Sequence, residues 1–154
     1  MFNMKYQLHF TFPTFQTGHG GYTPIQEDYS YWVPLIKHFI EKSDTVEIHC
    51  WNDEDEVIKE TKALVKELPK LPEDMTLTIF RGKLTDDISH YLLYNHIAET
   101  KNIKWFSIFL SKGDTTVFHS EHWGTEFFAR NLSQEEITYI TSVMPKDTNF
   151  NQYE

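Results

Sequence analysis

The sequence predicts an α+β domain, or an α/β domain, in which helices pack mainly on one face of a mixed β-sheet. Several segments alternate apolar and polar residues, as strands with one buried face do. Helix start signals lie between these segments, so strands and helices alternate along the first hundred residues or so. The chain has 154 residues and is 40% hydrophobic, which suits a single globular core.

Strand alternation is clearest in four segments, which are residues 6–12, 45–51, 75–80 and 104–110. Side chains along a strand alternate between faces, so one set of apolar residues should face the helices. The representatives of this set are Leu8, Ile48, Leu77 and Ile108. Residues 115–119 and 125–129 add shorter strands, and Lys112-Gly113-Asp114 is a hairpin turn signal. We therefore expect a sheet of five to six strands.

Helix signals follow the strands in the order β-α-β-α-β-α-β-β-β-α. The expected helices and their N-terminal signals are residues 31–42 after Ser30, 53–68 with a capping box from Asp53 to Glu56, 86–100 after Thr85, and a final helix with a capping box from Ser133 to Glu136. Parallel strands buried on both faces would be continuously apolar, whereas these strands alternate. This favours a two-layer sandwich formed by residues 1–145, followed by a flexible polar tail at 146–154.

The second face of the predicted sheet combines rings with hydrogen-bonding side chains. Its expected members are His9, Thr11, Glu47, His49, Trp51, Thr76, Thr78, Trp105, Ser107 and Phe109. Aromatic residues are enriched at protein interfaces, so an exposed face of this composition indicates a binding surface. The alternative is that long loops cover this face and its role is structural.

Net charge, cysteine content and hydropathy limit the partners and the cellular location that we expect. The net charge is −9 and only Arg81 and Arg130 are arginines, which argues against nucleic acids and anionic membranes. Cys50 is the only cysteine, so no intramolecular disulfide can form and a reducing cytoplasm is the expected location. The sequence shows no signal-peptide pattern and no apolar stretch of membrane-spanning length. An acidic protein is instead steered toward basic partners.

We find no pattern that indicates catalysis, a cofactor or a metal. His119 and His122 are the closest histidine pair, but positions three apart on a strand point to opposite faces, so we expect no metal site there. Cys50 lies at an inward strand position, where a buried thiol is more common than a nucleophile. The alternative is a small enzyme or small-molecule-binding domain with a pocket near the Gly18–Gly21 loop and His119/His122.

An acidic run directly after a tryptophan could anchor and steer a basic protein partner. The candidate partner-binding residues are Trp51, Asp53, Glu54, Asp55, Glu56, Trp105, His49 and His9. In size, acidity and lack of catalytic motifs, the chain resembles the small immunity proteins that block bacterial toxin domains. This resemblance implies an inhibitor that binds and neutralises a basic toxin domain.

Overall fold

The computed structural model describes residues 4–16, 22–24, 29–65 and 76–154. Its elements in chain order are β1 (Tyr6–Thr11), β2 (Thr14–Gln16), β3 (Tyr22–Pro24), α1 (Trp32–Ile40), β4 (Thr45–Trp51), α2 (Asp55–Leu64), β5 (Leu77–Lys83), α3 (Asp86–Tyr94), β6 (Ser107–Lys112), β7 (Thr115–Glu121), β8 (Glu126–Leu132), α4 (Gln134–Val143) and β9 (Asn149–Tyr153). Strands β2 and β3 form a separate small hairpin. The predicted α+β class is confirmed.

Seven strands form the main sheet in the order β5-β4-β6-β7-β8-β1-β9, and each neighbouring pair is antiparallel. The prediction of a mixed sheet with five to six strands was therefore wrong. Alternating strands and helices are typical of parallel pairing, which is why the sequence favours a mixed sheet. Strands β5 and β6, which follow one another around α3, do not pair with each other. They flank β4 on its two sides, and each is antiparallel to it.

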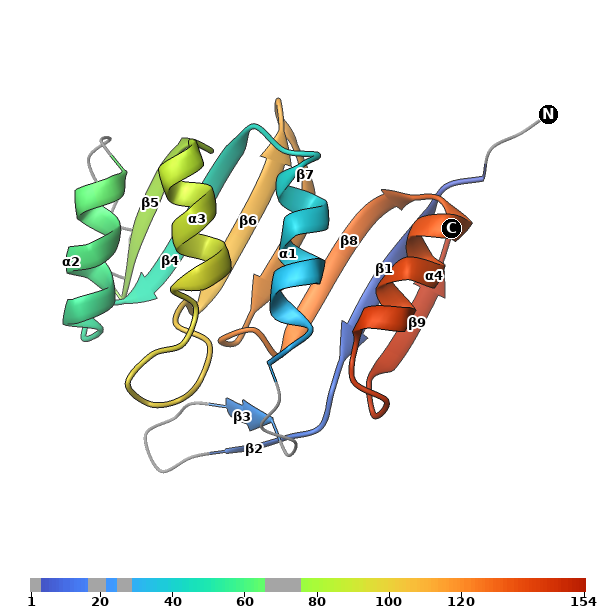
Figure 1. The fold of residues 1–154 in the computed structure, drawn as a ribbon, viewed down its shortest axis with the longest axis horizontal. Helices are drawn as coiled ribbons and strands as arrows, with labels where there is room; N and C mark the ends of the chain where they lie inside the picture. Colours follow the sequence, from blue (N-terminus) through green and yellow to red (C-terminus); the bar gives the residue numbers. More distant parts are fainter. Residues whose placement is uncertain (1–3, 17–21, 25–28, 66–75) are drawn as a thin grey trace.

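The four helices of the described residues lie on one face of the main sheet, in front of it in Figure 1. The core fills the space between the two layers. Phe39 of α1 stacks on Phe118 of β7 with ring centroids 4.4 Å apart, and both side chains are fully buried. Val46 and Ile48 of β4 are buried on the same face. The predicted two-layer arrangement follows from this apolar face, which the helices cover.

Strand β5 presents the opposite face from the one predicted. Thr78 pairs with Cys50 on the helix side and is 8% exposed, whereas Leu77 pairs with Trp51 on the other side. The buried Thr78 hydroxyl donates a hydrogen bond to the Asn52 side-chain oxygen at 2.6 Å. Residues 79 and 80 are both apolar, so alternation alone leaves the phase of this strand ambiguous. The observed phase buries Phe80, the larger of the two, completely.

The predicted N-terminal caps of the last two helices are confirmed. Ser133 and Glu136 form the predicted capping box of α4, and the Thr85 hydroxyl accepts a hydrogen bond from the Ile88 N–H at 3.2 Å. Helix α3 ends at Tyr94, earlier than expected. In the described part of the chain, none of the helices has the length and apolarity needed to cross a membrane.

Two predicted caps do not form. Helix α1 has Tyr31 as its N-cap residue, without a side-chain cap, so Ser30 does not cap it. Helix α2 begins at Asp55 with Glu54 as its N-cap residue, and the expected box from Asp53 is absent. The Glu54 carboxylate instead accepts the backbone N–H of Trp51 at 2.7 Å.

The C-terminal segment contains an ordered element where a loose polar tail was expected. Strand β9 pairs with β1 over its whole length. Phe150 lies over Phe10 with ring centroids 5.7 Å apart, on the helix side of the sheet. Local composition suggested a tail because only one of the nine residues from Lys146 to Glu154 is strongly apolar. The unpaired edge of β1 supplies the hydrogen-bonding partners that the segment lacks by itself.

Candidate functional site

The sheet face that the helices leave uncovered, here called the open face, carries a row of side chains from all seven strands. Antiparallel pairing places opposite residues on the same face, so the register defines this row directly. From one edge of the sheet to the other, the row consists of Arg81, Glu47, Phe109, His119, Phe128, His9 and Asn151.

The centre of this row is a stack of alternating imidazole and phenyl rings. Phe109 and His119 are 5.0 Å apart at 10°, and His119 and Phe128 are 4.4 Å apart at 9°. His9 continues the stack beyond Phe128 at 4.5 Å, and His49 adjoins Phe109 at 4.9 Å with a tilt of 43°. These spacings are close to the ~4.8 Å between neighbouring strands. The rings therefore stand upright on the sheet and cover one another; we call these five residues the ring stack.

Carboxylates flank the ring stack and contact its histidines. Glu126 bridges His9 at 3.0 Å and His122 at 3.2 Å, one partner for each carboxylate oxygen. Glu47 bridges His49 at 2.7 Å and Arg81 of the edge strand β5. Burial alone would raise the pKa of Glu47, but its hydrogen bonds to His49 and Arg81 outweigh burial and lower the pKa.

His119, in the middle of the stack, lies in a different environment from the outer histidines. Burial between two phenyl rings lowers its pKa, and the nearby Glu121 carboxylate offsets only part of this effect. The Nδ1 atom of His119 is 3.5 Å from the Glu121 carboxylate, which is long for a hydrogen bond. The neutral imidazole is thus the favoured form, and this ring acts as a stacking group.

A second aromatic group adjoins the end of β4, and we call it the edge cluster. Its rings are Trp51, Phe106 and Trp123, with Phe106 making edge contacts to Trp51 at 5.4 Å and to Trp123 at 4.8 Å. The Glu54 carboxylate lies beneath it, accepting the Trp51 N–H at 2.7 Å and the Trp123 indole N–H at 3.2 Å. Burial raises the pKa of Glu54. Trp51 remains 38% exposed, so the cluster presents a ring to solvent.

The hairpin between β7 and β8 links the edge cluster to the ring stack through a strained turn. His122, Trp123 and Gly124 have φ angles of 53°, 56° and 73°, all in the left-handed region. Hairpin turns of this hand favour Asn and Gly, and a larger residue costs about 1–2 kcal/mol there. A side chain at Gly124 would also meet Ile103 at 2.7 Å. The fold thus holds two bulky side chains in an unfavourable conformation beside the row.

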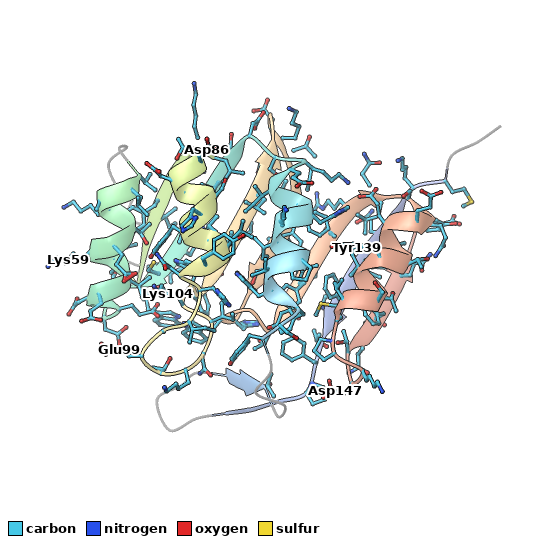
Figure 2. The ribbon with its side chains drawn as sticks, in the orientation of Figure 1. Lys59, Asp86, Glu99, Lys104, Tyr139 and Asp147 are labelled. Atoms are coloured by element: carbon cyan, nitrogen blue, oxygen red, sulfur yellow. The ribbon has the colours of Figure 1, made fainter. Side chains whose placement is uncertain are left out.

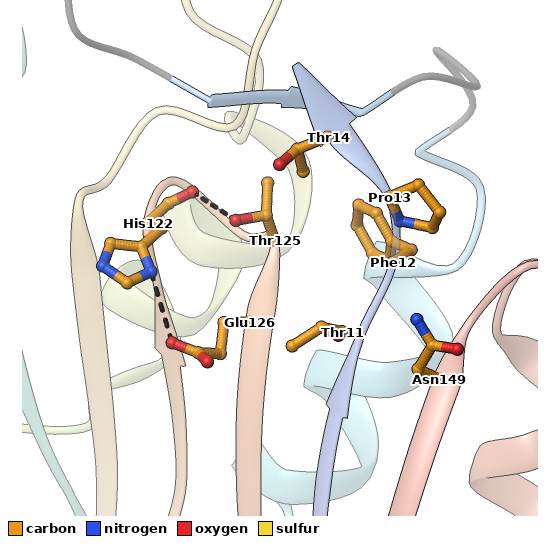
Figure 3. Close-up of a pocket in the computed structure, with 8 residues that line it drawn as sticks. All are labelled: Thr11, Phe12, Pro13, Thr14, His122, Thr125, Glu126 and Asn149. Atoms are coloured by element: carbon orange, nitrogen blue, oxygen red, sulfur yellow. Dashed lines mark hydrogen bonds and ion pairs between the residues drawn. The ribbon is translucent and has the colours of Figure 1, made fainter. Parts of the chain in front are cut away.

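Two open hollows lie at opposite ends of the row. One, of about 340 Å³, is bounded by β1, β8 and β9, and Figure 3 shows His122 and Glu126 at one side of it with Asn149 opposite. The other, of about 620 Å³, is lined in part by Glu47, Arg81 and Phe109. Both hollows are shallow features of the surface, better suited to projecting side chains of a partner than to an enclosed ligand.

The structure brings four of the eight predicted partner-binding residues to this surface. His9 and His49 are the two ends of the ring stack, although they lie on strands that do not pair with each other. Trp51 and Glu54 belong to the edge cluster. The remaining acids of the predicted run, Asp53, Asp55 and Glu56, are exposed at the start of α2.

The predicted placement of Trp105 on the open face was wrong. Its side chain is fully buried on the helix side, stacked 6.1 Å from Trp32 and in edge contact with Tyr91 at 5.2 Å. Strand β6 begins only at Ser107, so the alternation that runs through Lys104–Leu110 in the sequence does not hold at Trp105. This tryptophan is therefore a core residue.

Sequence reasoning missed much of what completes the site. The residues not identified as site members are Phe106, Trp123, Glu126 and Phe128. For Phe128 the signal was ambiguous, because Phe127 and Phe128 are adjacent rings and alternation puts one of them, without saying which, on the open face. For Phe106 and Trp123, the signal lies in contacts between the end of β4, the start of β6 and the β7–β8 turn, which no local pattern encodes.

The closest histidine pair in the sequence does not share a ligand. His119 lies near the Glu121 carboxylate, and His122 contacts the Glu126 carboxylate. Within the described residues, no group of three or more His, Cys, Asp or Glu side chains is arranged to hold a metal ion. The Gly18–Gly21 loop, invoked in the alternative small-molecule pocket, lies outside the described residues. His122 lines the smaller hollow, whereas His119 is enclosed in the ring stack.

The chain matches no protein-family model, no curated protein and no solved structure.

Proposed function

We propose that this protein is a protein-binding module that docks a basic partner on the open face. The observation that carries this proposal is the row of rings and carboxylates on a sheet face that no helix of the described chain covers. Rigid aromatic side chains supply contact area at small entropic cost, since stacking already restricts their rotation. The partner class that fits the whole chain best is a basic toxin domain, which the module would neutralise as an immunity-type inhibitor.

Charge supports a basic partner. The chain has a net charge of −9, and Glu47, Glu121 and Glu126 all lie along the row. Surface carboxylates attract a cationic protein over roughly 8–10 Å at physiological salt and raise the rate of encounter. The exposed acids at the start of α2, beside the edge cluster, extend this acidic border.

The contacts that slow dissociation should come from aromatic rings that become buried when the partner binds. Trp51 is the best anchor because it is 38% exposed and packs on Phe106, which fixes its orientation. The hollow bounded by Glu47, Arg81 and Phe109 can receive a side chain of the partner near one end of the row. Tryptophan is among the residues most enriched at interface hot spots.

The test uses the product of the reading frame next to the gene as the candidate partner. That protein is expressed alone, with the wild-type chain, with Trp51→Ala, and with Tyr139→Ala as a matched control. Tyr139 is 40% exposed but lies on α4 in the helix layer (Figure 2). We expect growth arrest by the neighbour, relief by the wild type and by Tyr139→Ala, and weaker relief by Trp51→Ala.

Binding kinetics of the purified pair separate the effect of surface charge on association from the effect of Trp51 on dissociation. The association rate should fall as salt rises, because screening shortens the reach of the surface charge. Trp51→Ala should mainly raise the dissociation rate. A neighbour that causes no arrest and forms no complex with the chain would contradict the toxin-inhibitor proposal. A complex that is equally tight in both variants and insensitive to salt would contradict the open face as its binding surface.

A further inference from the structure

Strand β9 is the outermost strand at one end of the sheet. It pairs with β1 on one side, and no other strand in the described residues pairs with its second side. Alternate residues of an edge strand direct backbone N–H and C=O groups away from the sheet. Such an edge can accept a further strand from another chain, so natural proteins usually protect it.

The two edges of this sheet differ in that protection. Edge strand β5 carries Arg81, whose side chain is 50% exposed, and the exposed Lys83. Edge strand β9 has the sequence Asn-Phe-Asn-Gln-Tyr, without a charged residue and without proline. Strand β5 is guarded against edge pairing, and β9 is not.

The helix beside this edge is uncharged on the same side. Gln134, Thr138 and Thr141 are exposed and spaced four and three residues apart, which puts them on one face of α4. That face is next to β9, because the Gln152 side-chain amide donates a hydrogen bond to Gln134 Oε1 at 3.4 Å. Strand and helix together therefore form an uncharged polar rim at this end of the molecule.

We propose that a second copy of this chain pairs with β9, strand edge to strand edge and antiparallel. The register that engages all five residues of β9 is centred on Asn151, so that Asn151 faces its own copy and Asn149 faces Tyr153. Helices of both copies then lie on the same side of one continuous sheet, because the two-fold axis is perpendicular to the sheet. No charged side chain within β9 meets another in this arrangement.

The lack of charge at this edge favours a second copy of the chain over a basic partner, and the small contact area indicates a weak dimer. A basic protein is attracted to carboxylates, which β9 and the adjacent face of α4 lack. A copy with net charge −9 is repelled at a distance, but an uncharged rim keeps like charges apart on contact. We expect five paired residues and one helix face to bury less than the ~1,200–2,000 Å² of a stable interface, so the dimer should be weak and should form only as the concentration rises.

Pairing would join the open faces of two copies. His9 of the ring stack is directly opposite Asn151 in the row, so each row would meet its symmetry mate at the centre of the combined sheet. This inference does not rest on the proposed partner. The open face could bind its partner with or without pairing at β9.

The experiment measures the mass of the full chain by sedimentation over about a hundredfold range of concentration. The wild type should rise from one copy toward two. Asn151→Lys and Asn151→Asp each place two like charges opposite one another and should self-associate several-fold more weakly. An equimolar mixture of the two variants places opposite charges together and should restore pairing. Thr115→Lys, which adds the same charge at an exposed strand residue outside β9, serves as control and should behave as the wild type.

A wild type that remains monomeric throughout would overturn the inference, and so would an Asn151→Lys variant that pairs as well as the wild type. A mixture that fails to restore pairing would overturn the centred register. Growth rescue in the test of the proposed function is a separate readout, so either proposal can fail while the other stands.

Discussion

Phe127 and Phe128 are neighbours in β8, yet they meet opposite environments. Phe127 faces the helices, is fully buried, and contacts the rings of Phe10, Phe118 and Tyr31. Phe128 faces the open side and is half-buried between His9 and His119. The helix face obtains its burial from a second layer, whereas Phe128 on the open face is covered by the rings of its neighbours in the same sheet.

This difference separates stability from recognition. A ring enclosed by two layers contributes its full transfer free energy and cannot reach a partner. A ring that stands upright in a row keeps its edge in solvent while its faces are covered, so it is ordered in advance and remains available for contact. The same strands thus hold the core on one side and present a surface on the other.

Truncating the two phenylalanines separately gives the largest expected difference between the two faces. Phe127→Ala should destabilise the protein by about 3–5 kcal/mol, because a large ring leaves a cavity in a packed core. Phe128→Ala should cost only about 1–2 kcal/mol, because neighbouring side chains and water can fill the gap in the row. Urea denaturation of both variants measures the difference. Equal losses would mean that the open face is as enclosed as the core.

The two faces should also lose stability at different pH. On the helix side, burial alone would raise the pKa of Glu136, but hydrogen bonds from Lys42 and His38 lower it from 4.5 to about 2. Its stabilisation is therefore full above pH 4.5 and is lost as the pH falls toward 2. On the open face, burial lowers the pKa of His119 from 6.5, so stability should begin to fall as the pH drops below 6.5.

Two conservative variants separate these pH windows. Glu136→Gln should flatten the loss below pH 4.5, and His119→Phe should reduce the loss that starts near 6.5 while keeping a ring in the stack. The measurement is the free energy of unfolding in urea over this pH range. A His119→Phe variant with the same slope as the wild type near pH 6 to 6.5 would show that the middle of the row is not shielded from water.

A smaller effect tests how the helix layer is anchored. Ser133→Ala should cost about 1 kcal/mol, since it removes the observed cap of α4. Asp53→Ala should cost less than about 0.5 kcal/mol, because the cap that the sequence suggests for α2 is absent. Thermal unfolding of both variants decides the point. A loss at Asp53 as large as that at Ser133 would mean that α2 is capped in a way the structure does not show.

The smallest expected effect concerns the strained turn that joins the edge cluster to the open face. His122→Asn puts a residue that tolerates the left-handed region at a φ of 53°. It also removes the contact with Glu126, which is partly exposed and contributes little to stability. We expect stability to be unchanged or to rise by a few tenths of a kcal/mol, while partner binding weakens. A clear loss of stability would show that the histidine has a structural role.

Local sequence patterns determined where most elements lie. Strict alternation located β1 and β4 with the correct inward faces, because period two has one solution when one face is wholly apolar. The capping box located α4 because its two hydrogen bonds are made within four residues. Where the local signal was ambiguous, as in β5 with apolar residues on both faces, the predicted phase was wrong.

Tertiary structure alone decided how these elements combine and what the open face looks like. Strand order, the antiparallel pairing of β4 with both of its neighbours, and the recruitment of residues 149–153 into the sheet depend on contacts far apart in the sequence. The sequence identified His9 and His49 as surface candidates, but their connection through Phe109, His119 and Phe128 exists only in the assembled register. Ring stacking at the strand spacing is a property of neighbouring strands, so no segment encodes it by itself.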